Sequence, residues 1–545
     1  MASKHIEMVV SSVVQWARPN IAYAVRSRLW LVWILAAVIG VGTAFGAIAF
    51  RELIGLVQWT WLATRTEQVA SAARLLPWYT VLFVPAFGGL LVGLFLHYIQ
   101  PGKRHLGVSD VIEGKLDPDR SLRFWPGIGS AFVSATSLGF GSSTGREGPV
   151  VHLGAVIAAS IARVFRLPAA SNKVLLACGV AGAVSASFNA PIAGVLFAHE
   201  VILGHYALTA FSAIVIASGA ATIISRIYFG DVAAFAIPDY QITSYWEFPA
   251  FAILGLVCAL VAILFQYALI GTDYVARTVR APVFIRPMVG GLVVGFIAIW
   301  FPQVLGVGYQ ATDLALRTQL PLDLMLILVV LKTIATAICL ASRFGGGIFS
   351  PSLYLGAMTG GAFGLIAASA FPDMASSEGL YAILGMGAVA AAVIGAPLST
   401  TMIVFELTGG YALSIALLLT VSIATGISIA VHGRSYFYWQ LESRGLAVAD
   451  GPHAQLMRTV KVADFMQRIS PNVKERPPPL EEGAPRLLTT DTMERALRVF
   501  DETGSAEIPV VRAAAVGQTV GYALQVDALR FFNAALIDAS IEEHK

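Results

Sequence analysis

The chain is dominated by long apolar runs separated by short polar breaks. The first run, Leu29 to Phe50, is long enough for a membrane-spanning helix, which needs about 20 residues. Further apolar segments follow at 77–98, 126–141, 150–165, 174–188, 191–203, 206–228, 248–272, 284–301, 322–341, 351–371, 379–394, 397–408 and 411–431. Several of them are too short to cross a bilayer alone, and Gly or Pro residues separate them. Broken helices at membrane depth are tolerated where protein surrounds them or where they line a polar cavity. The pattern therefore predicts an all-α polytopic membrane domain over 29–440, of the kind found in transporters and channels.

The pattern changes after Gly445, where the chain becomes polar. A linker over 441–485 contains the proline-rich stretch Pro471–Pro479, which is unsuited to helix or central strand. Beyond it we expect a small α/β cytoplasmic domain over 486–545, with its first strand earlier in the chain. The expected elements are a strand near 459–466, a capped helix starting at Thr490, strands at 508–511 and 520–524, and a helix at 526–535.

An internal repeat is visible in the membrane domain. The segment from Gly179 to Pro191 matches the segment from Gly385 to Pro397 at an offset of 206 residues, and at this offset Glu200 falls on Glu406. A second block repeats just upstream at nearly the same offset. Two blocks in the same order at nearly one offset are not what a chance match of small residues gives. We place the two repeats at roughly 77–230 and 284–431.

The second repeated block lies just upstream of the first. The stretch Gly145–Ala155 matches Gly347–Ala357 at an offset of 202 residues, which makes Glu147 and Phe349 repeat mates. Paired repeats with interrupted helices in matching positions indicate a binding site between the two halves, near the membrane midplane.

Composition agrees with a membrane protein and excludes several other classes. The 545 residues are 57% hydrophobic and 13% charged, the mean hydropathy is +0.74, and the charged residues concentrate after Glu442. A net charge of +3 and the lack of a basic patch with interleaved aromatics give no reason to expect a nucleic-acid partner. Three cysteines in apolar runs give neither a disulfide framework nor metal-ligand spacing, so we expect no metal, no cofactor and no enzyme activity.

The N-terminal segment, residues 1–28, carries the topology signal. Arg18, Arg26 and Arg28 precede the first apolar run, which is too long for a signal-peptide core. The positive-inside bias predicts a cytoplasmic N-terminus and, with the polar tail, a cytoplasmic C-terminus in a multi-pass inner (cell) membrane protein.

The stretch Gly145-Arg146-Glu147-Gly148-Pro149 places an acid and a base inside an apolar region. Ionisable residues at membrane depth cost about 2.5 kcal/mol or more and usually mark an ion path or proton relay. Pro149 fits the first turn of a helix, where its missing N–H is no loss. The free N–H groups and the positive dipole end of such a helix would point at an anion. The alternative is a simple interfacial ion pair at a helix end.

These motifs, in this order, resemble the CLC family of chloride channels and proton-coupled chloride antiporters, over most of residues 29–440. Gly145–Pro149 is similar to that family's GREGP motif, and Gly347-Ile-Phe-Ser-Pro351 is similar to its GxFxP motif. The runs Phe188–Gly194 and Gly395–Leu398 fit the flanking helices. The resemblance implies a CLC-type inverted-repeat fold with broken helices and a homodimer with one anion pathway per subunit. The implied partners are chloride or another small anion and the lipid bilayer.

The same resemblance implies roles for particular residues. Glu147 would be the gating glutamate, whose carboxylate occupies an anion site when ionised and swings away when protonated. The backbone N–H groups of Ile348 and Phe349 would face the central anion, with Gly145, Arg146 and Gly148 completing the anion-binding set. Donors held by helix geometry can replace part of the hydration shell of an ion and still let it leave.

Three positions depart from the family pattern. Where the family's GSGIP motif supplies a serine hydroxyl to the anion, this chain has His105-Leu106-Gly107-Val108-Ser109, with Gly107 as anchor and Leu106 in the place of the serine. Ser109 could supply a hydroxyl in another register of the loop.

The second departure is at the internal proton site of the antiporters. The residue after Glu200 is normally a glutamate there and is Val201 here, as in channel members. His199 or Glu200 would be the nearest other groups able to carry a proton. The competing interpretation makes Glu200 a structural helix-end residue, like Glu406, and makes His199 and His152 ordinary core histidines.

The third departure is at the family's central tyrosine. Aligning Gly433–Phe437 puts Phe437 in its place, whereas a one-residue shift restores Tyr438. Interfacial anchoring is the alternative role for this aromatic run. Without hydroxyls at Leu106 and Phe437, backbone dipoles would be the main anion ligands, which predicts a weaker or less chloride-selective central site.

The tail resembles one CBS motif. Because CBS motifs normally pack in pairs, the missing half would come from the other subunit, and a regulatory appendage without a nucleotide ligand is favoured over a nucleotide sensor. For the whole chain we expect passive chloride conduction gated by Glu147. Proton-coupled antiport is the alternative, and a non-conducting sensor or scaffold the third hypothesis.

Overall fold

The structure is a computed structural model of the 545-residue chain. It describes residues 18, 29–116, 122–231, 235, 240, 242–279, 281–372, 375–408, 413–446, 457, 460–469, 484–512 and 515–544. The chain forms two compact units, Met1–Trp439 and Gln440–Lys545, close to the predicted domain boundary. The expected N-terminal segment, apart from Arg18, and the proline-rich stretch of the linker lie outside the described residues.

The helix is the regular element of the first unit within the described residues. Its helices and short 3-10 or π turns are α2 (Leu29–Leu62), α3 (Val69–Arg74), α4 (Trp78–Tyr98), η1 (Pro101–Lys103), α5 (Val108–Leu116), α7 (Phe124–Gly139), α8 (Glu147–Phe165), α9 (Ala169–Phe188), α10 (Pro191–Phe197), η2 (Ala198–Leu203), α11 (Leu208–Phe229), η3 (Tyr245–Glu247), α12 (Phe248–Thr278), α13 (Arg286–Trp300), η4 (Pro302–Val304), α14 (Tyr309–Leu316), α15 (Leu322–Ala341), α16 (Phe349–Ala370), α17 (Glu378–Ile394), α18 (Pro397–Thr408), α19 (Ser414–His432) and α20 (Tyr436–Glu442). Within the described residues, nine helices are long and apolar enough to cross a membrane. The prediction of an all-α polytopic membrane protein is confirmed.

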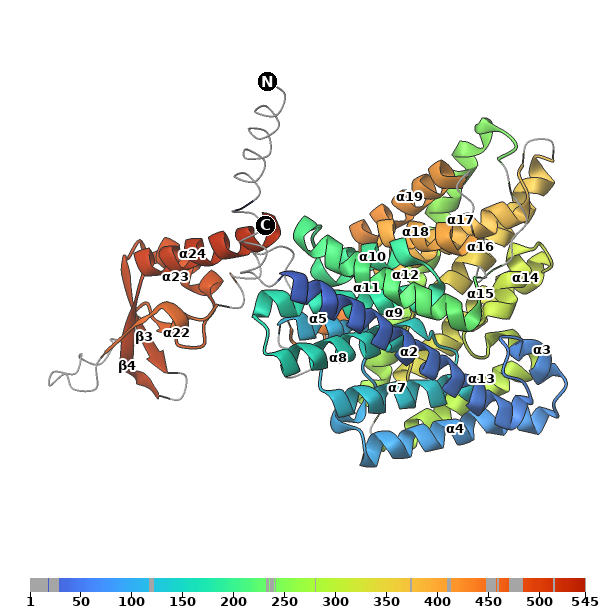
Figure 1. Ribbon diagram of the computed structural model, residues 1–545, viewed down its shortest axis with the longest axis horizontal. Coiled ribbons are helices and arrows are strands. Elements are labelled where there is room, and N and C mark those ends of the chain that lie inside the picture. The colour runs from blue at the N-terminus through green and yellow to red at the C-terminus, as the bar shows by residue number, and fades with distance from the viewer. Residues whose placement is uncertain are drawn as a thin grey trace, which may run out of the picture. The chain divides into compact units, whose positions relative to one another are not determined.

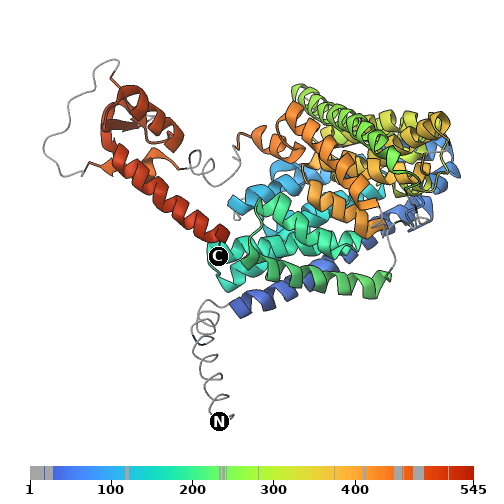
Figure 2. The same cartoon turned by 90° about the horizontal axis from the view of Figure 1, so that it is seen from above.

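The helices pack as pairs that follow the sequence repeat. α8 packs against α9, and α16, the mate of α8, packs in the same way against α17, the mate of α9. Figure 1 shows α2 running across α9 and α11, which it contacts. In Figure 2 the long α12 lies along α17 and α19 of the second repeat. The pairs α8 with α9 and α16 with α17 therefore form the buried core of the two halves.

One glycine contact recurs in both halves. A methyl group on Gly154 of α8 would lie 2.3 Å from the carbonyl oxygen of Gly179 on α9, and one on Gly356 of α16 would lie 2.2 Å from that of Gly385 on α17. Both distances are far inside van der Waals contact, so only glycine lets these backbones approach so closely. Small residues at helix contacts are the usual means of packing helices within a membrane.

The second unit is a small α/β domain, as predicted. Its elements are α22 (Val462–Phe465), β1 (Gln467–Arg468), β2 (Leu487–Leu488), α23 (Met493–Thr503), β3 (Glu507–Arg512), β4 (Ala515–Leu524) and α24 (Gln525–His544). The strands form one sheet in the order β1-β4-β3-β2, with β2 and β3 parallel and the other pairs antiparallel. The apolar faces of α22, α23 and the sheet meet in a core that includes Phe465, Leu487 and Phe500.

Several expected elements of this unit have different bounds or types: the strand expected at 520–524 begins earlier, at Ala515, and the helix expected at 526–535 continues to His544. The strand expected near 459–466 is wrong, because the structure has the short helix α22 there and the strand β1 begins at Gln467. Backbone bonds from Val462 N to Asp491 O and from Met493 N to Val460 O join this segment to the start of α23 instead of to the sheet. The helix expected from Thr490 begins at Met493, since Thr492 is its cap and accepts a bond from Arg495 N at 3.4 Å.

Candidate anion site and gate

The two repeats meet at the loops that begin α8 and α16. Gly145 N donates to Gly347 O and Gly347 N donates to Gly145 O, both at 2.7 Å, which makes an isolated antiparallel bridge. A methyl group on Gly145 would lie 3.0 Å from Glu147 Oε2 and 3.1 Å from Gly347 O. Glycine at this position therefore lets the two loops close around the Glu147 carboxylate.

A third helix start lies at the same place. A methyl group on Gly148 would lie 3.3 Å from Gly347 Cα and 3.9 Å from a methyl of Val108, the first residue of α5. The N-terminal ends of α5, α8 and α16 are therefore neighbours. Each helix start carries N–H groups without an intrahelical acceptor and the positive end of the helix dipole. Such a convergence can hold a carboxylate or a small anion without a formal positive charge.

The Glu147 carboxylate is bound at this convergence. Its side chain is 3% exposed, Tyr309 Oη donates to Oε1 at 2.7 Å, and Ser350 Oγ donates to Oε2. Tyr309 is the first residue of α14, and Ser350 lies in the first turn of α16. Both carboxylate oxygens therefore accept a hydroxyl bond inside the protein, and each such bond to a charged group is worth about 1.5–3 kcal/mol.

Sequence reasoning missed both hydroxyls. Ser350 lies inside the GxFxP-like motif, at a position to which the motif gives no role. Tyr309 is 162 residues from Glu147 in the chain. The one signal for it is its position directly after Gly308, whose φ of 92° marks a tight turn. A tight turn of this kind can be predicted from glycines in the sequence. The contact of the Tyr309 hydroxyl with Glu147 cannot.

Arg146 points into a network of charges beside the carboxylate. Its Nη1 lies 2.6 Å from Glu67 Oε1, its Nε lies 3.7 Å from Glu147 Oε1, and its guanidinium stands 4.7 Å from the centre of the Tyr309 ring. Arg51 lies 3.5 Å from the same Glu67 oxygen. The Arg146 side chain is 8% exposed, and burial of a lone guanidinium would cost several kcal/mol. The carboxylates of Glu67 and Glu147 offset that cost, so Arg146 is a paired cation beside the Glu147 carboxylate.

The remaining expected anion ligands lie on three segments, which are the start of α16, the residues before α5, and α20. Ile348 and Phe349 are buried, and the Phe349 ring packs on Phe188 at 5.1 Å between centroids. Leu106 is half-buried before α5, where its N–H donates to Ser130 Oγ at 2.7 Å. Phe437 in α20 is 7% exposed, whereas its neighbour Tyr438 is half-buried. Gly107 N donates to Asp110 Oδ2 at 2.8 Å and so takes part in capping α5.

The internal proton-site position lies on η2, a π-helical turn. Val201 is 7% exposed there and has no group that could carry a proton. The Glu200 carboxylate accepts bonds from Leu398 N at 3.1 Å and Ser399 N at 2.7 Å, and from the Ser399 hydroxyl. Glu200 therefore caps α18. His199 is 1% exposed and its Nδ1 lies 3.1 Å from His205 O, while its Nε2 is buried without a hydrogen-bond partner among the described residues.

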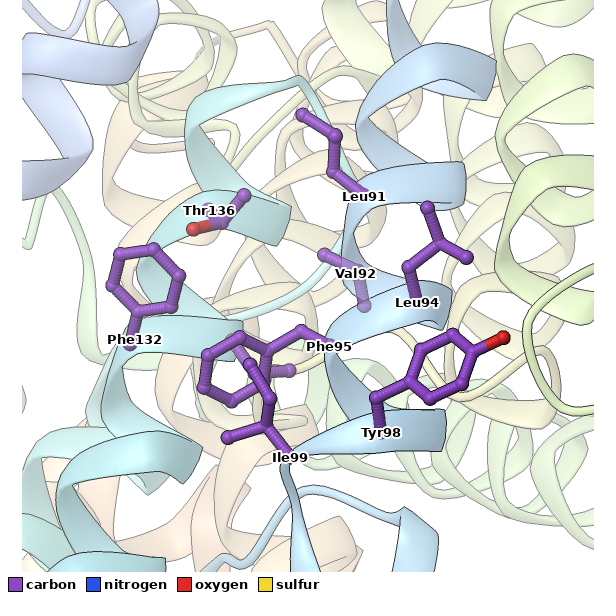
Figure 3. A pocket seen from close by; sticks show the side chains of 9 residues that line it. Leu91, Val92, Leu94, Phe95, Tyr98, Ile99, Phe132 and Thr136 are labelled. Carbon is purple, nitrogen blue, oxygen red and sulfur yellow. The ribbon is translucent and has the colours of Figure 1, made fainter.

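An apolar groove of about 360 Å³ lies elsewhere on the unit, between α4 and α7. Figure 3 shows Phe95 and Phe132 facing one another across it, with their rings 5.2 Å apart, and Tyr98 at one end. Thr136 and Tyr98 carry the side-chain oxygen atoms of its lining. No residue of the Glu147 cluster lines the groove, and its apolar lining suits hydrocarbon and not an ion.

Comparisons with known proteins show the family of the chain. A family model described as "Voltage gated chloride channel" matches residues 88–429. The "Putative chloride channel protein ClcB-like" of Ralstonia nicotianae is 33% identical over 389 residues, which cover 71% of this chain and 90% of that protein. The "H(+)/Cl(-) exchange transporter ClcA" of Vibrio cholerae is 30% identical over 426 residues, which cover 76% of this chain and 90% of the relative.

Solved structures share the fold. A slow cyanobacterial Cl-/H+ antiporter matches with a TM-score of 0.68 at 23% identity, over 77% of this chain and 99% of that one. A eukaryotic CLC transporter matches with a TM-score of 0.65 at 20% identity, over 93% of this chain and 89% of that one. At these identities the solved structures are evidence for the fold alone. The family model covers more than half of the chain and is evidence for the family. The chain therefore belongs to the CLC family.

Proposed function

We propose that this protein carries chloride passively across a membrane and that Glu147 is the gate. One observation supports this above the rest, which is that the Glu147 carboxylate lies where the starts of α5, α8 and α16 converge. A carboxylate and a halide ion compete for the same kind of donor, because both are anions that accept N–H and O–H bonds. The gate and the permeating ion would therefore exchange at one position.

The gating step follows from the hydrogen bonds of Glu147. In its observed place the carboxylate accepts bonds from Tyr309 and Ser350, which favour the ionised side chain. Protonation removes the charge that both hydroxyls and the helix ends stabilise, so the side chain is free to leave and chloride can enter. When the proton leaves, the carboxylate returns and displaces the ion. Acidic solutions would therefore open the path.

Two features of the inner half favour passive transport. Val201 cannot take up a proton, and both oxygens of Glu200 are engaged by the first turn of α18. A relay through Glu200 would have to break those bonds in each cycle. The presence of a glutamate at position 200 is therefore better explained by its role as the cap of α18 than by proton transfer.

Proton-coupled anion antiport is the second candidate. Relatives such as the Vibrio cholerae protein are named as exchange transporters. His199 has a buried Nε2 without a partner among the described residues, one residue before Glu200 and two before Val201. A proton entering by this histidine would supply the inner half of a coupled path.

We further propose that the central anion site is weak. Leu106 and Phe437 stand where hydroxyl ligands are expected, so backbone groups at Ile348 and Phe349 would carry most of the binding. Calorimetry should give a chloride affinity that rises on Leu106→Ser. Ile366→Ser, at an exposed position of α16, is the control and should leave the affinity unchanged. Tight chloride binding that is unaltered by Leu106→Ser would contradict this proposal.

The oligomeric state and the tail are also proposals. A homodimer in the inner (cell) membrane, with cytoplasmic termini, would let the single CBS-like unit of one subunit pair with its copy in the other. The unit has its own buried core and a four-stranded sheet, which is enough to form one half of such a pair. We assign it a contact role without a nucleotide ligand.

Reconstitution into liposomes separates the candidates. A chloride gradient is imposed, and chloride efflux and external pH are recorded together. Passive transport predicts chloride flux without opposed proton movement, and antiport predicts proton movement in a fixed ratio to chloride. An absence of chloride flux would leave the sensor or scaffold hypothesis and would overturn the proposed function.

A further inference from the structure

Lys332 is a buried lysine in the middle of α15. Its side chain is fully buried, and within the part of the chain that the structure describes no acidic side chain pairs with it. A lysine inside a spanning helix is costly and is retained where it has a function. Its role has to come from the groups around its ammonium.

The ammonium binds an irregular segment of backbone. Nζ donates to Val304 O at 3.0 Å and to Gly306 O at 2.9 Å, and it stands 5.1 Å from the centre of the Tyr354 ring on α16. Non-helical backbone at membrane depth requires partners for its polar groups. Lys332 supplies these partners for two carbonyls in the turn between η4 and α14.

The segment held by Lys332 leads directly to the gate. Gly306 N also donates to Gly141 O at 3.2 Å, and Gly308 has a φ of 92°, so the turn is fixed at two points and enters α14 at Tyr309. A methyl group on Gly308 would lie only 2.6 Å from the Tyr354 ring and 3.3 Å from Lys332 Nζ. The Tyr309 hydroxyl then reaches Glu147 Oε1 at 2.7 Å.

We propose that Lys332 is a positioning residue of the Glu147 gate, holding the turn over 304–308 so that the Tyr309 hydroxyl stays on the carboxylate. This inference rests on the proposed function. Lys332 does not touch Glu147, and its effect passes through Tyr309. Without the two Lys332 hydrogen bonds the turn is held less firmly, so the Tyr309 hydroxyl holds the Glu147 carboxylate less well. The gate would then open more readily.

The charged and titratable groups around the two ends of this connection are few. Tyr354 of α16 and Cys339 of α15 face Lys332. Arg146 and Tyr309 face Glu147 directly, and Glu67 and Arg51 act on it through Arg146. Substitutions at Lys332, Thr333 and Tyr309 leave the ion pair between Arg146 and Glu67 in place, so a change in pH response among them traces to the Lys332 to Tyr309 connection.

The test measures chloride flux against pH in liposomes for Lys332→Met, with Thr333→Val as the matched control. Thr333 is the next residue of α15, is half-buried, and bonds only within its helix, to Val329 O. Lys332→Met is expected to raise flux at alkaline pH by about 3- to 10-fold and to move half-activation upward by about 0.5–1 pH unit. Thr333→Val should match the wild-type profile.

The connection itself is tested by combining variants. In a Tyr309→Phe background Lys332→Met should add no further shift, and in a Glu147→Gln background it should change neither flux nor pH response. The proposal would be overturned if the pH shift of Lys332→Met added fully to that of Tyr309→Phe. It would also be overturned if Lys332→Met reduced chloride flux equally with Glu147 and with Gln at position 147.

Further variants cover a failure of Lys332→Met to fold. Lys332→Arg keeps the cation and its donors and should restore most of the wild-type profile, while Lys332→Gln keeps a donor and should give a smaller shift than Met. Wild-type profiles for both, or a larger shift for Arg than for Gln, would overturn the proposal. If the wild-type protein passes no chloride, the proposed function fails; if it does and Lys332→Met behaves like Thr333→Val, only the role of Lys332 fails.

Discussion

Glu200 caps α18, the short helix that contains Glu406, and Glu406 caps α10, the short helix that precedes Glu200. Glu200 follows α10 and binds two N–H groups at the start of α18, while Glu406 lies in α18 and binds two N–H groups at the start of α10. The bonds of Glu406 are Ile192 N to Oε1 at 3.0 Å and Ala193 N to Oε2 at 2.7 Å. The two halves of the membrane unit are thus joined by a pair of equivalent charge-assisted contacts at the 206-residue offset.

We expect Glu200→Gln and Glu406→Gln to destabilise the protein by similar amounts. Each replaces a charged acceptor at a helix start with a neutral one, at a cost of about 1–2 kcal/mol. Thermal unfolding of the purified protein checks this, with Glu378→Gln as a control in the first turn of α17. The passive account also predicts that Glu200→Gln leaves the ratio of chloride to proton movement unchanged. A change in that ratio for Glu200→Gln and not for Glu406→Gln would favour a proton path through Glu200.

Tyr309→Phe should make the gate open at higher pH. The variant removes one hydroxyl bond to the ionised carboxylate, and a bond to a charged group is worth about 1.5–3 kcal/mol, or about 1–2 pH units. The sign follows because the bond favours the charged, closed form, so its loss lets protonation occur at a lower proton concentration. Chloride flux recorded across pH measures the shift, and Tyr228→Phe, an exposed tyrosine, should show none. A downward shift or no shift would mean that Tyr309 does not hold the gate.

Gly145→Ala should weaken pH control without preventing transport. The added methyl would lie 3.0 Å from Glu147 Oε2 and 3.1 Å from Gly347 O, so the carboxylate or the facing loop must move. We expect a smaller ratio of acid to alkaline flux, measured as for Tyr309→Phe. Gly219→Ala on α11 is the control, since no described atom beyond its own stretch of helix lies within 4 Å of the added methyl. Equal ratios in both variants would show that the bridge tolerates a side chain and does not set the gate.

Phe500→Ala should unfold the tail and spare the gate. Phe500 is 1% exposed in the core of the second unit, and truncation of a buried phenylalanine costs about 3–5 kcal/mol. A lower unfolding temperature of the tail is expected, with an unchanged pH response of chloride flux. Arg498→Ala, an exposed change on the same helix, should leave the tail stable. Loss of the pH response in Phe500→Ala would show that the tail acts on the gate.

The repeat and its glycines made much of the membrane unit predictable. Offsets of 202 and 206 residues make Gly145 and Gly347, and Glu200 and Glu406, repeat mates, and the members of each pair have matching places in the two halves because repeated sequence folds into repeated structure. Glu147 was predictable for a second reason, since an acid inside an apolar run needs partners. The identity of those partners was not, because Tyr309 is brought to Glu147 by packing of distant helices.

Element bounds and isolated charges were harder to read. The first apolar run ends at Phe50, but α2 continues to Leu62, because Arg51 and Glu52 lie at the helix surface and do not interrupt its backbone bonds. Lys332 is the one basic residue of the apolar segment 322–341 and belongs to no motif. Its partners are backbone carbonyls, which carry no side-chain signal. In the tail, a four-residue helix replaced a predicted strand, since local bonds to the start of α23 outweighed the β-forming residues.

The measurement that tests the gate most directly is chloride flux across pH in liposomes, compared between the wild-type protein and Glu147→Gln. Glutamine has nearly the shape of a protonated glutamate and cannot become an anion, so we predict high flux that no longer depends on pH. A Glu147→Gln profile that rises and falls with pH as the wild-type profile does would contradict the assignment of Glu147 as the gate.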